Sequence, residues 1–246
     1  MSKPAQRPPD DAKPLELVMH ASTEVLLLAL SFMVGMAALI ALMAVGVIPD
    51  PEGAAWSGIV AGPVLIGTAG AAYLGFERLL GRSEGPARPL VSPAERKRAG
   101  VCVLIALAGV VVALAGSAVL GFIQEQLLET AVEEQEAIVE LVARGQTWEL
   151  ALLAVSAVVL APLTEEWLFR HMFFRRLLHR SGLTLAWILP ALAFSLAHWN
   201  PVGVAIYVWL GLVFAACYLL SGRLWVAMAV HAGHNAVAFS LLLWPP

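Results

Sequence analysis

The stretch LALLAVSAVVLAPLTEEWLFR, residues 150–170, joins an apolar run to two adjacent carboxylates and an arginine. A helix needs about 20 mainly apolar residues to cross the hydrocarbon core of a bilayer. Ionisable side chains at that depth are costly, so they usually face the protein interior and serve a function. The stretch therefore predicts a membrane-embedded helix that carries a polar site.

The rest of the chain has the composition of a membrane protein. Hydrophobic residues make up 60% and charged residues 13%, whereas soluble domains have about 45–50% and 25%. We expect an all-α, polytopic transmembrane bundle of about seven spans, within a range of six to eight. The expected spans are Glu24–Ile48, Ala54–Phe76, Ala99–Ile123, Leu150–Phe169, Leu183–Trp199, Val202–Ser221 and Leu224–Trp244.

Outside the spans, two segments stand apart in composition. Residues 1–20 are expected to form a disordered cytoplasmic tail, since their first part is rich in proline and charge, and residues 21–246 to form one membrane-embedded domain. The acidic segment Gln124–Glu149 has apolar residues at helical spacing, which favours an amphipathic helix on the outer side, serving as packing or as a lid. Cys102 and Cys217 lie within apolar spans and are interpreted as packing residues.

The basic residues predict the orientation. With seven crossings and a cytoplasmic N-terminus, every lysine and arginine except Arg144 falls on one side. This asymmetry is what the positive-inside rule expects. We therefore predict an integral membrane protein with its N-terminus in the cytoplasm and its C-terminus outside. The compact chain with short loops favours a bacterial inner (cytoplasmic) membrane.

The two adjacent acids have different expected roles. Glu166 and Arg170 are four positions apart, so on a helix they share a face and can pair. Glu165 is turned by about 100° from Glu166, and a carboxylate in a low-dielectric pocket suits a general base or acid. A solvated helix end in the interfacial layer is the alternative interpretation of both acids.

Two further polar groups interrupt the later spans. His198 follows Phe194 at the end of a span, just before the helix-breaking Trp199-Asn200-Pro201. A rise of 1.5 Å per residue makes His198 too deep for a helix that starts at the interface. We therefore expect that helix either to start outside the membrane or to be bent and non-spanning.

In the last span, His231 and Asn235 are four positions apart and project from one face. His234 lies close to that face, either as a second participant or, as we favour, as an internal hydrogen-bond partner. A lone histidine in such a span is commonly a packing residue, but three polar motifs in succession indicate a hydrolytic site.

These three motifs resemble those of the CPBP intramembrane proteases, also called the CAAX prenyl protease and bacteriocin-processing (Abi) family. The family pattern is EExxxR, FxxxH and HxxxN on successive membrane segments, and the resemblance covers roughly residues 150–244. It implies that Glu165 activates water, that His198 and His231 bind or stabilise the reacting centre, and that Asn235 helps to stabilise the oxyanion. Glu166 and Arg170 would hold the site together.

Cofactor and function stay open at this point. We favour a metal-free, glutamic-type intramembrane endopeptidase, while zinc held by Glu165, His198 and His231 is the alternative. The expected partners are the lipid bilayer and a membrane-associated or lipid-anchored protein or peptide substrate, with no nucleic acid. A non-catalytic immunity or binding protein and a proton-coupled transporter are the competing functions.

Overall fold

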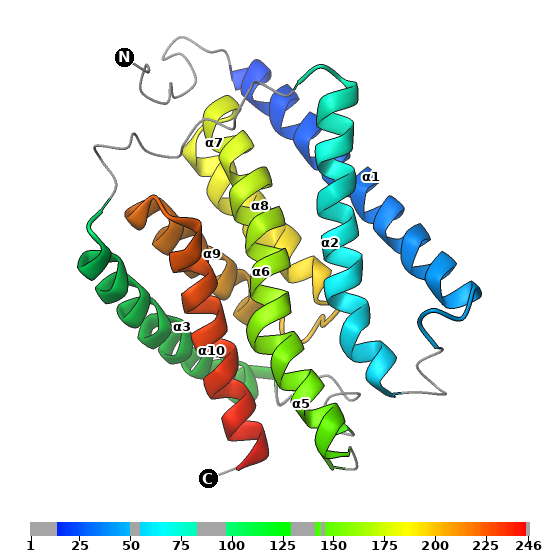
Figure 1. Cartoon of the computed structure of the whole chain (residues 1–246). Coiled ribbons are helices and arrows are strands. Elements are labelled where there is room, and N and C mark those ends of the chain that lie inside the picture. Colours follow the sequence, from blue (N-terminus) through cyan, green and yellow to red (C-terminus); the bar gives the residue numbers. More distant parts are fainter. Residues whose placement is uncertain (1–13, 50–54, 83–96, 129–140, 144–145, 245–246) are drawn as a thin grey trace.

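A computed structural model describes residues 14–49, 55–82, 97–128, 141–143 and 146–244, and these residues form an all-helical bundle (Figure 1). The expected all-α fold is confirmed. Its helices are α1 (Pro14–Ala44), α2 (Ala55–Leu79), α3 (Ala99–Leu128), α5 (Thr147–Val155), the π-helix η1 (Ser156–Leu160), α6 (Ala161–Glu165), the π-helix η2 (Glu166–Phe174), α7 (Arg175–Arg180), α8 (Leu183–Ala197), α9 (Val204–Ser221) and α10 (Leu224–Leu243).

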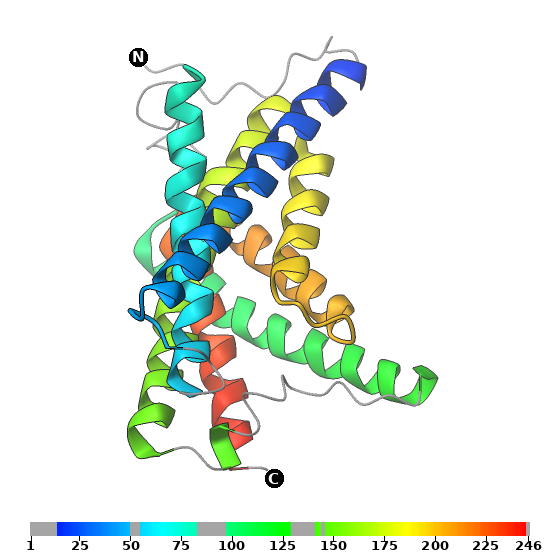
Figure 2. The same cartoon turned by 90° about the vertical axis from the view of Figure 1, so that its right-hand side faces the viewer.

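Within the described residues, six helical stretches are long and apolar enough to cross a membrane. They correspond to six of the seven expected spans. The seventh, expected at Leu183–Trp199, is the shorter helix α8, whose 15 residues contain Pro190. Figure 2 shows α3 and α9 lying side by side and tilted away from the upright α2 and α5.

The expected span 150–169 is part of one continuous stretch, Thr147–Arg180, in which short α-helices alternate with two π-helices. In η1 the N–H of Ala161 donates to the carbonyl of Ser156, five residues back. The next residue is Pro162, which has no N–H to continue the ladder. Wider π turns of this kind are frequent at functional sites.

Helix α2 packs along this composite helix and contacts α5, η1, α6 and η2. The Ser156 hydroxyl donates to the carbonyl of Ile59 at 2.9 Å. A Cβ atom at Gly70 would lie only 2.5 Å from Cζ3 of Trp167. Glycine is therefore required at this position for α2 to approach the helix that carries Glu165.

An ion network connects α1 and α2 to α7. It consists of two buried glutamates, a tyrosine and three partly exposed arginines: Glu24, Glu77, Tyr73, Arg82, Arg176 and Arg180. Arg82 contacts both glutamates, while Arg176 pairs with Glu77 and Arg180 lies 3.8 Å from Glu24. These contacts agree with the expectation that the basic residues after the second and fourth spans share one side.

Two segments outside the expected spans, the N-terminal tail and the acidic segment, differ from the expectation or lie partly outside the described residues. Helix α1 begins at Pro14. Residues 14–20, which were expected to belong to the disordered tail of residues 1–20, are therefore helical. The reason is that α1 extends beyond its apolar core at its N-terminal end, where Glu16 lies in the first turn. Most of the acidic segment 124–149, including residues 129–140, lies outside the described residues, as does Arg144.

Candidate active site

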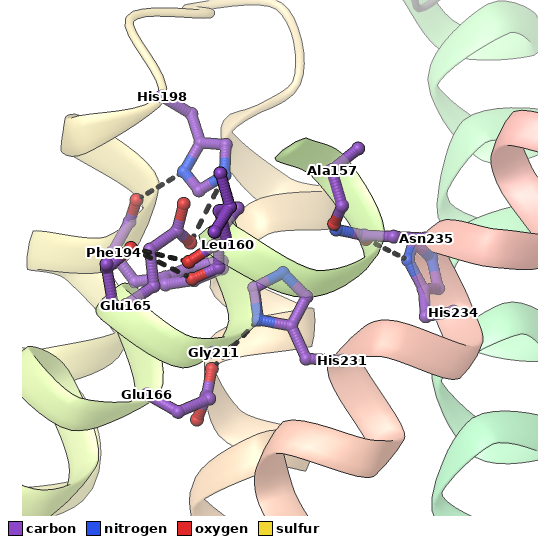
Figure 3. Close-up of polar contacts among 12 residues, drawn as sticks. Ala157, Leu160, Glu165, Glu166, Phe194, His198, Gly211, His231, His234 and Asn235 are labelled. Atoms are coloured by element: carbon purple, nitrogen blue, oxygen red, sulfur yellow. Dashed lines mark hydrogen bonds and ion pairs between the residues drawn. The ribbon is translucent and has the colours of Figure 1, made fainter. Parts of the chain in front are cut away.

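The side chains of the three motifs meet where the composite helix, the end of α8 and the middle of α10 come together (Figure 3). Glu165 ends α6, and Glu166 begins η2. His198 follows the last residue of α8, and His231 and Asn235 lie within α10. The fold therefore brings Glu166, Arg170 and His231 into contact and places Glu165 beside His198. Asn235 instead contacts Ala157 and His234.

Glu166 is fully buried and is shared by two cationic or donor side chains. Its Oε1 lies 3.0 Å from Nη1 of Arg170 and 3.0 Å from Nδ1 of His231. The predicted pairing of Glu166 with Arg170 is thus confirmed, and His231 is an additional partner. Glu166 links the composite helix to α10.

Arg170 is also fully buried and is surrounded by aromatic rings. Its guanidinium carbon lies 4.5 Å from the ring centroid of Phe194 and 5.3 Å from that of Phe214. Its Nη2 donates to the backbone carbonyl of Gly211 at 3.1 Å. A planar guanidinium combines such stacking with directed hydrogen bonds, which a lysine ammonium cannot do. Arg170 therefore ties three helices together around Glu166.

Glu165 faces a different neighbour, as its turn from Glu166 predicted. Its Oε2 lies 3.9 Å from Nε2 of His198. This oxygen is buried and has no hydrogen-bond partner among the residues that the structure describes. Glu165 therefore has an oxygen available beside His198, whereas Oε1 of Glu166 is engaged by Arg170 and His231.

The hydrogen bond of His198 indicates which nitrogen of its ring carries a proton. Its Nδ1 lies 2.7 Å from the backbone carbonyl of Phe194. A carbonyl oxygen only accepts hydrogen bonds, so Nδ1 carries the proton and Nε2 of the neutral imidazole is an acceptor. When this imidazole is neutral and the carboxylate is ionised, Nε2 of His198 and Oε2 of Glu165 are two acceptors 3.9 Å apart.

Asn235 supports the π-helical turn η1. Its Nδ2 donates to the carbonyl of Ala157 at 2.8 Å. In the five-residue spacing of η1 this carbonyl would bond the N–H of residue 162, which is proline and has none. Asn235 thus supplies the donor that Pro162 lacks, and its second amide hydrogen stays available to the site.

His231 and Asn235 both contact the composite helix, as their shared face predicted, but at points nine residues apart along the chain. His234 places its Nδ1 3.2 Å from Oδ1 of Asn235. This contact agrees with the interpretation of His234 as an internal hydrogen-bond partner.

The side chains do not assemble a metal site in this arrangement. Among the described residues, no three histidine, cysteine or acidic side chains lie close enough together to hold a metal ion. The set proposed from the sequence, Glu165, His198 and His231, therefore does not converge as ligands here. Glu166 contacts Nδ1 of His231, whereas Glu165 lies near Nε2 of His198.

Sequence reasoning missed several residues that hold the site. Tyr207 and Phe214 of α9 stack on His198 and His231, with ring centroids 4.2 Å and 4.6 Å apart. In the sequence they are ordinary aromatic residues of an apolar span, so no local signal distinguishes them. Their seven-residue spacing, which places them on one face, is the only available indication.

Comparison with known proteins identifies the segment that carries these motifs. Residues 147–237 match the model of the family described as "Type II CAAX prenyl endopeptidase Rce1-like". This segment of the chain is therefore similar to the Rce1-like family. The resemblance to CPBP proteases inferred from the three motifs is thereby confirmed.

A relative of the chain in Bacillus subtilis (strain 168) is described as "Putative membrane peptidase YdiL". The two are 24% identical over 148 residues, which cover 59% of each protein. No solved structure matches the chain significantly. Together, the six apolar helical stretches and the family match show that the protein is an integral membrane protein.

Proposed function

We propose that this protein is an intramembrane endopeptidase in which Glu165 activates water to hydrolyse a peptide bond. The substrate would be a membrane-associated or lipid-anchored protein or peptide. We further propose a bacterial cytoplasmic membrane as its location, with the N-terminus of the chain on the cytoplasmic side. The Rce1-like family match and the membrane peptidase described in Bacillus subtilis support the reaction class.

The observation that carries the proposal is the pair of facing acceptors. Oε2 of Glu165 and Nε2 of His198 are 3.9 Å apart, and neither can donate to the other while the carboxylate is ionised and the imidazole neutral. A water molecule beside them satisfies both, because it donates one hydrogen to each. Such a water is oriented by two bases and is ready for deprotonation.

In the proposed reaction Glu165 takes one proton from this water while its oxygen attacks the carbonyl carbon of the scissile bond. The carbonyl becomes a tetrahedral oxyanion. When that intermediate collapses, the carbon–nitrogen bond breaks and Glu165 returns the proton to the departing amine. One water is consumed, and a new carboxyl and a new amino terminus form.

The oxyanion needs donors that are in place before the reaction. We propose the second amide hydrogen of Asn235 for this role, because its first is committed to Ala157. His231 would contribute from its Nε2 when protonated, since its Nδ1 is held by Glu166. Glu166 and Arg170 then act by fixing His231 and do not need to touch the substrate.

The test is a comparison of new protein termini in membranes of cells that carry different variants. Cells with the gene deleted are complemented with the wild-type chain, with Glu165→Gln, or with Glu125→Gln as a control. Glu125 is an exposed glutamate on α3. Labelling of new amino termini should find a cleavage that requires the wild type or the control variant and is absent with Glu165→Gln.

Equal cleavage with Glu165→Gln would rule out Glu165 as the base. If deletion of the gene changes no protein terminus in the membrane, and Glu165→Gln still rescues the phenotype of the deletion, the protein is a non-catalytic binding protein.

A further inference from the structure

Helix α9 contains none of the three motifs, yet one of its faces contacts three motif side chains. Tyr207, Gly211 and Phe214 are spaced by four and three residues, so they share a face of the helix. Tyr207 contacts His198, the carbonyl of Gly211 accepts from Arg170, and Phe214 contacts His231. We refer to these three residues as the α9 face.

The contact of Tyr207 with His198 restrains a degree of freedom that the hydrogen bond leaves open. The bond from Nδ1 to the carbonyl of Phe194 fixes one atom of the imidazole. Rotation about the bond between Cβ and the ring is broad for histidine, so the plane of the ring needs a second restraint. The Tyr207 ring lies 4.2 Å away and 27° from parallel, which supplies that restraint.

The backbone at His198 departs from a regular helix. His198 lies beyond the last residue of α8, and Trp199 has a positive φ of 50° and is 80% exposed. A non-glycine residue in this region of φ is uncommon and costs free energy. The turn between α8 and α9 is held by the hydrogen bond from the Ser195 hydroxyl to the carbonyl of Val204, and Tyr207 adds a stacking contact with His198.

His231 has an equivalent arrangement. Its Nδ1 is held by Glu166, and the ring of Phe214 lies 4.6 Å away at 19° from parallel. Each histidine of the site thus has a hydrogen bond at Nδ1 and an aromatic ring from α9 against its face. The same arrangement occurs twice, two helical turns apart on α9. This repetition supports a role of the α9 face in orienting both histidines.

Two glycines set the position of the α9 face. A Cβ atom at Gly211 would lie 2.8 Å from Cα of Ala191, so glycine is what lets α9 approach α8. A Cβ atom at Gly203 would lie 2.7 Å from Cε2 of Tyr207 and 3.2 Å from Cγ of Asn200. The Tyr207 ring therefore rests directly on the backbone of Gly203.

From these contacts we propose that Tyr207 is a positioning residue, which holds the His198 imidazole so that Nε2 faces Glu165. The proposal rests on the proposed peptidase function, for which this geometry matters. The Tyr207 ring acts together with the ring of Phe194, whose centroid lies 4.6 Å from that of His198 but is tilted by 49°. Misplacement of a reacting group by about 1 Å is enough to cost roughly a hundredfold in rate.

The first test compares Tyr207→Phe with Tyr207→Leu in purified full-length protein in detergent. The substrate is the membrane protein whose cleavage depends on Glu165 in the experiment above. Tyr207→Leu should lower kcat about tenfold to a hundredfold with KM nearly unchanged, and Tyr207→Phe should restore it because the ring remains. Tyr218→Leu, which removes a tyrosine from α9 that packs on Phe174 instead, is the matched control and should keep the wild-type kcat.

A second test uses Gly203→Ala, which displaces the ring without removing it. Gly203 has φ −82° and ψ 2°, which alanine tolerates, so the new methyl group acts on its neighbours and not on the backbone. Gly203→Ala should lower kcat in the wild type but add little in the Tyr207→Leu background. Such non-additivity is expected only if both changes act through the ring.

A third readout does not depend on turnover. The His198 side chain is 20% exposed and can react with diethyl pyrocarbonate, while the exposed His20 serves as an internal reference. Carbethoxylation of His198, measured by mass spectrometry, should become several-fold faster in Tyr207→Leu and Gly203→Ala and stay at the wild-type rate in Tyr207→Phe.

The outcomes separate the two proposals. Absence of any Glu165-dependent cleavage contradicts the proposed function, while the reactivity of His198 still decides whether Tyr207 holds it. Wild-type kcat and wild-type His198 reactivity in folded Tyr207→Leu would overturn the positioning role. Equal loss of kcat in Tyr207→Phe and Tyr207→Leu would overturn it too, since the hydroxyl and not the ring would then be responsible.

Discussion

Glu166 and His231 are 65 positions apart in the sequence, yet Oε1 of the carboxylate lies 3.0 Å from Nδ1 of the imidazole. The same oxygen lies 3.0 Å from Nη1 of Arg170. One buried atom therefore joins the two most distant motifs, and the site depends on Glu166 even though Glu165 is the proposed base.

Glu166→Gln should cost more stability than Glu165→Gln. The first change leaves the buried Arg170 guanidinium without its carboxylate partner, and breaking a buried pair typically costs about 3–5 kcal/mol. Glu165 has no arginine or lysine partner among the described ion pairs, and its Oε2 accepts no hydrogen bond there, so its replacement should leave stability nearly unchanged. Denaturant or thermal unfolding in detergent measures the difference, and equal stability of the two variants would contradict it.

Arg170→Ala should reduce both the folded yield and the activity, because Glu166 and His231 lose the group that fixes them. Arg170→Lys should recover only part of the stability, since lysine keeps the charge but cannot reproduce the stacking on Phe194 and the bond to Gly211 together. Loss of activity with full stability would instead place Arg170 in contact with the substrate.

Asn235→Ala should lower both kcat and stability. Removal of an oxyanion donor costs about a hundredfold to a thousandfold in kcat, and an unsatisfied Ala157 carbonyl adds about 1–3 kcal/mol of instability. In a Pro162→Ala background the restored N–H can bond that carbonyl, so the stability cost of Asn235→Ala should shrink. An undiminished cost in the double variant would refute the link between Pro162 and Asn235.

Arg176→Ala should destabilise the packing of α1 and α2 on α7 without lowering kcat. Glu77 is buried and would keep only Arg82, whose Nη1 lies 3.7 Å away. The cost should stay below about 3–5 kcal/mol, since Arg176 is partly exposed. Glu77→Gln combined with Arg176→Gln should recover stability, and unfolding in detergent tests both points.

Metal analysis of the purified protein decides between the glutamic and zinc schemes. We expect activity to survive treatment with a chelator, because Glu165, His198 and His231 do not converge as a ligand set. Stoichiometric zinc whose removal stops cleavage would overturn this expectation and make those three residues its candidate ligands.

Local sequence was enough to predict the helical membrane fold and to single out the candidate site residues. Apolar runs of sufficient length predict spans because the bilayer core has a fixed thickness. The four-residue spacing of Glu166 and Arg170 predicts their pair because it follows from the pitch of a helix. The motifs Glu165, His198, His231 and Asn235 were recognisable as polar residues in otherwise apolar segments.

The burial of Glu24 and Glu77 was not predictable in the same way. Glu24 was taken as the first residue of a span, but it is fully buried among Tyr73, Arg82 and Arg180. A glutamate near the end of an apolar run is equally compatible with a solvated position. Only the packing of α1 on α2 and α7 decides between the two.

The sequence by itself determined which residues are polar inside the membrane, because hydropathy and helical pitch are local properties. The tertiary structure alone decided how they pair: His231 with Glu166, Asn235 with the carbonyl left open by Pro162, and Tyr207 with His198. Those contacts join helices distant in the chain and depend on π-helical turns and close glycine packing. Local spacing does not encode them, because they follow from how the apolar faces of different helices fit together.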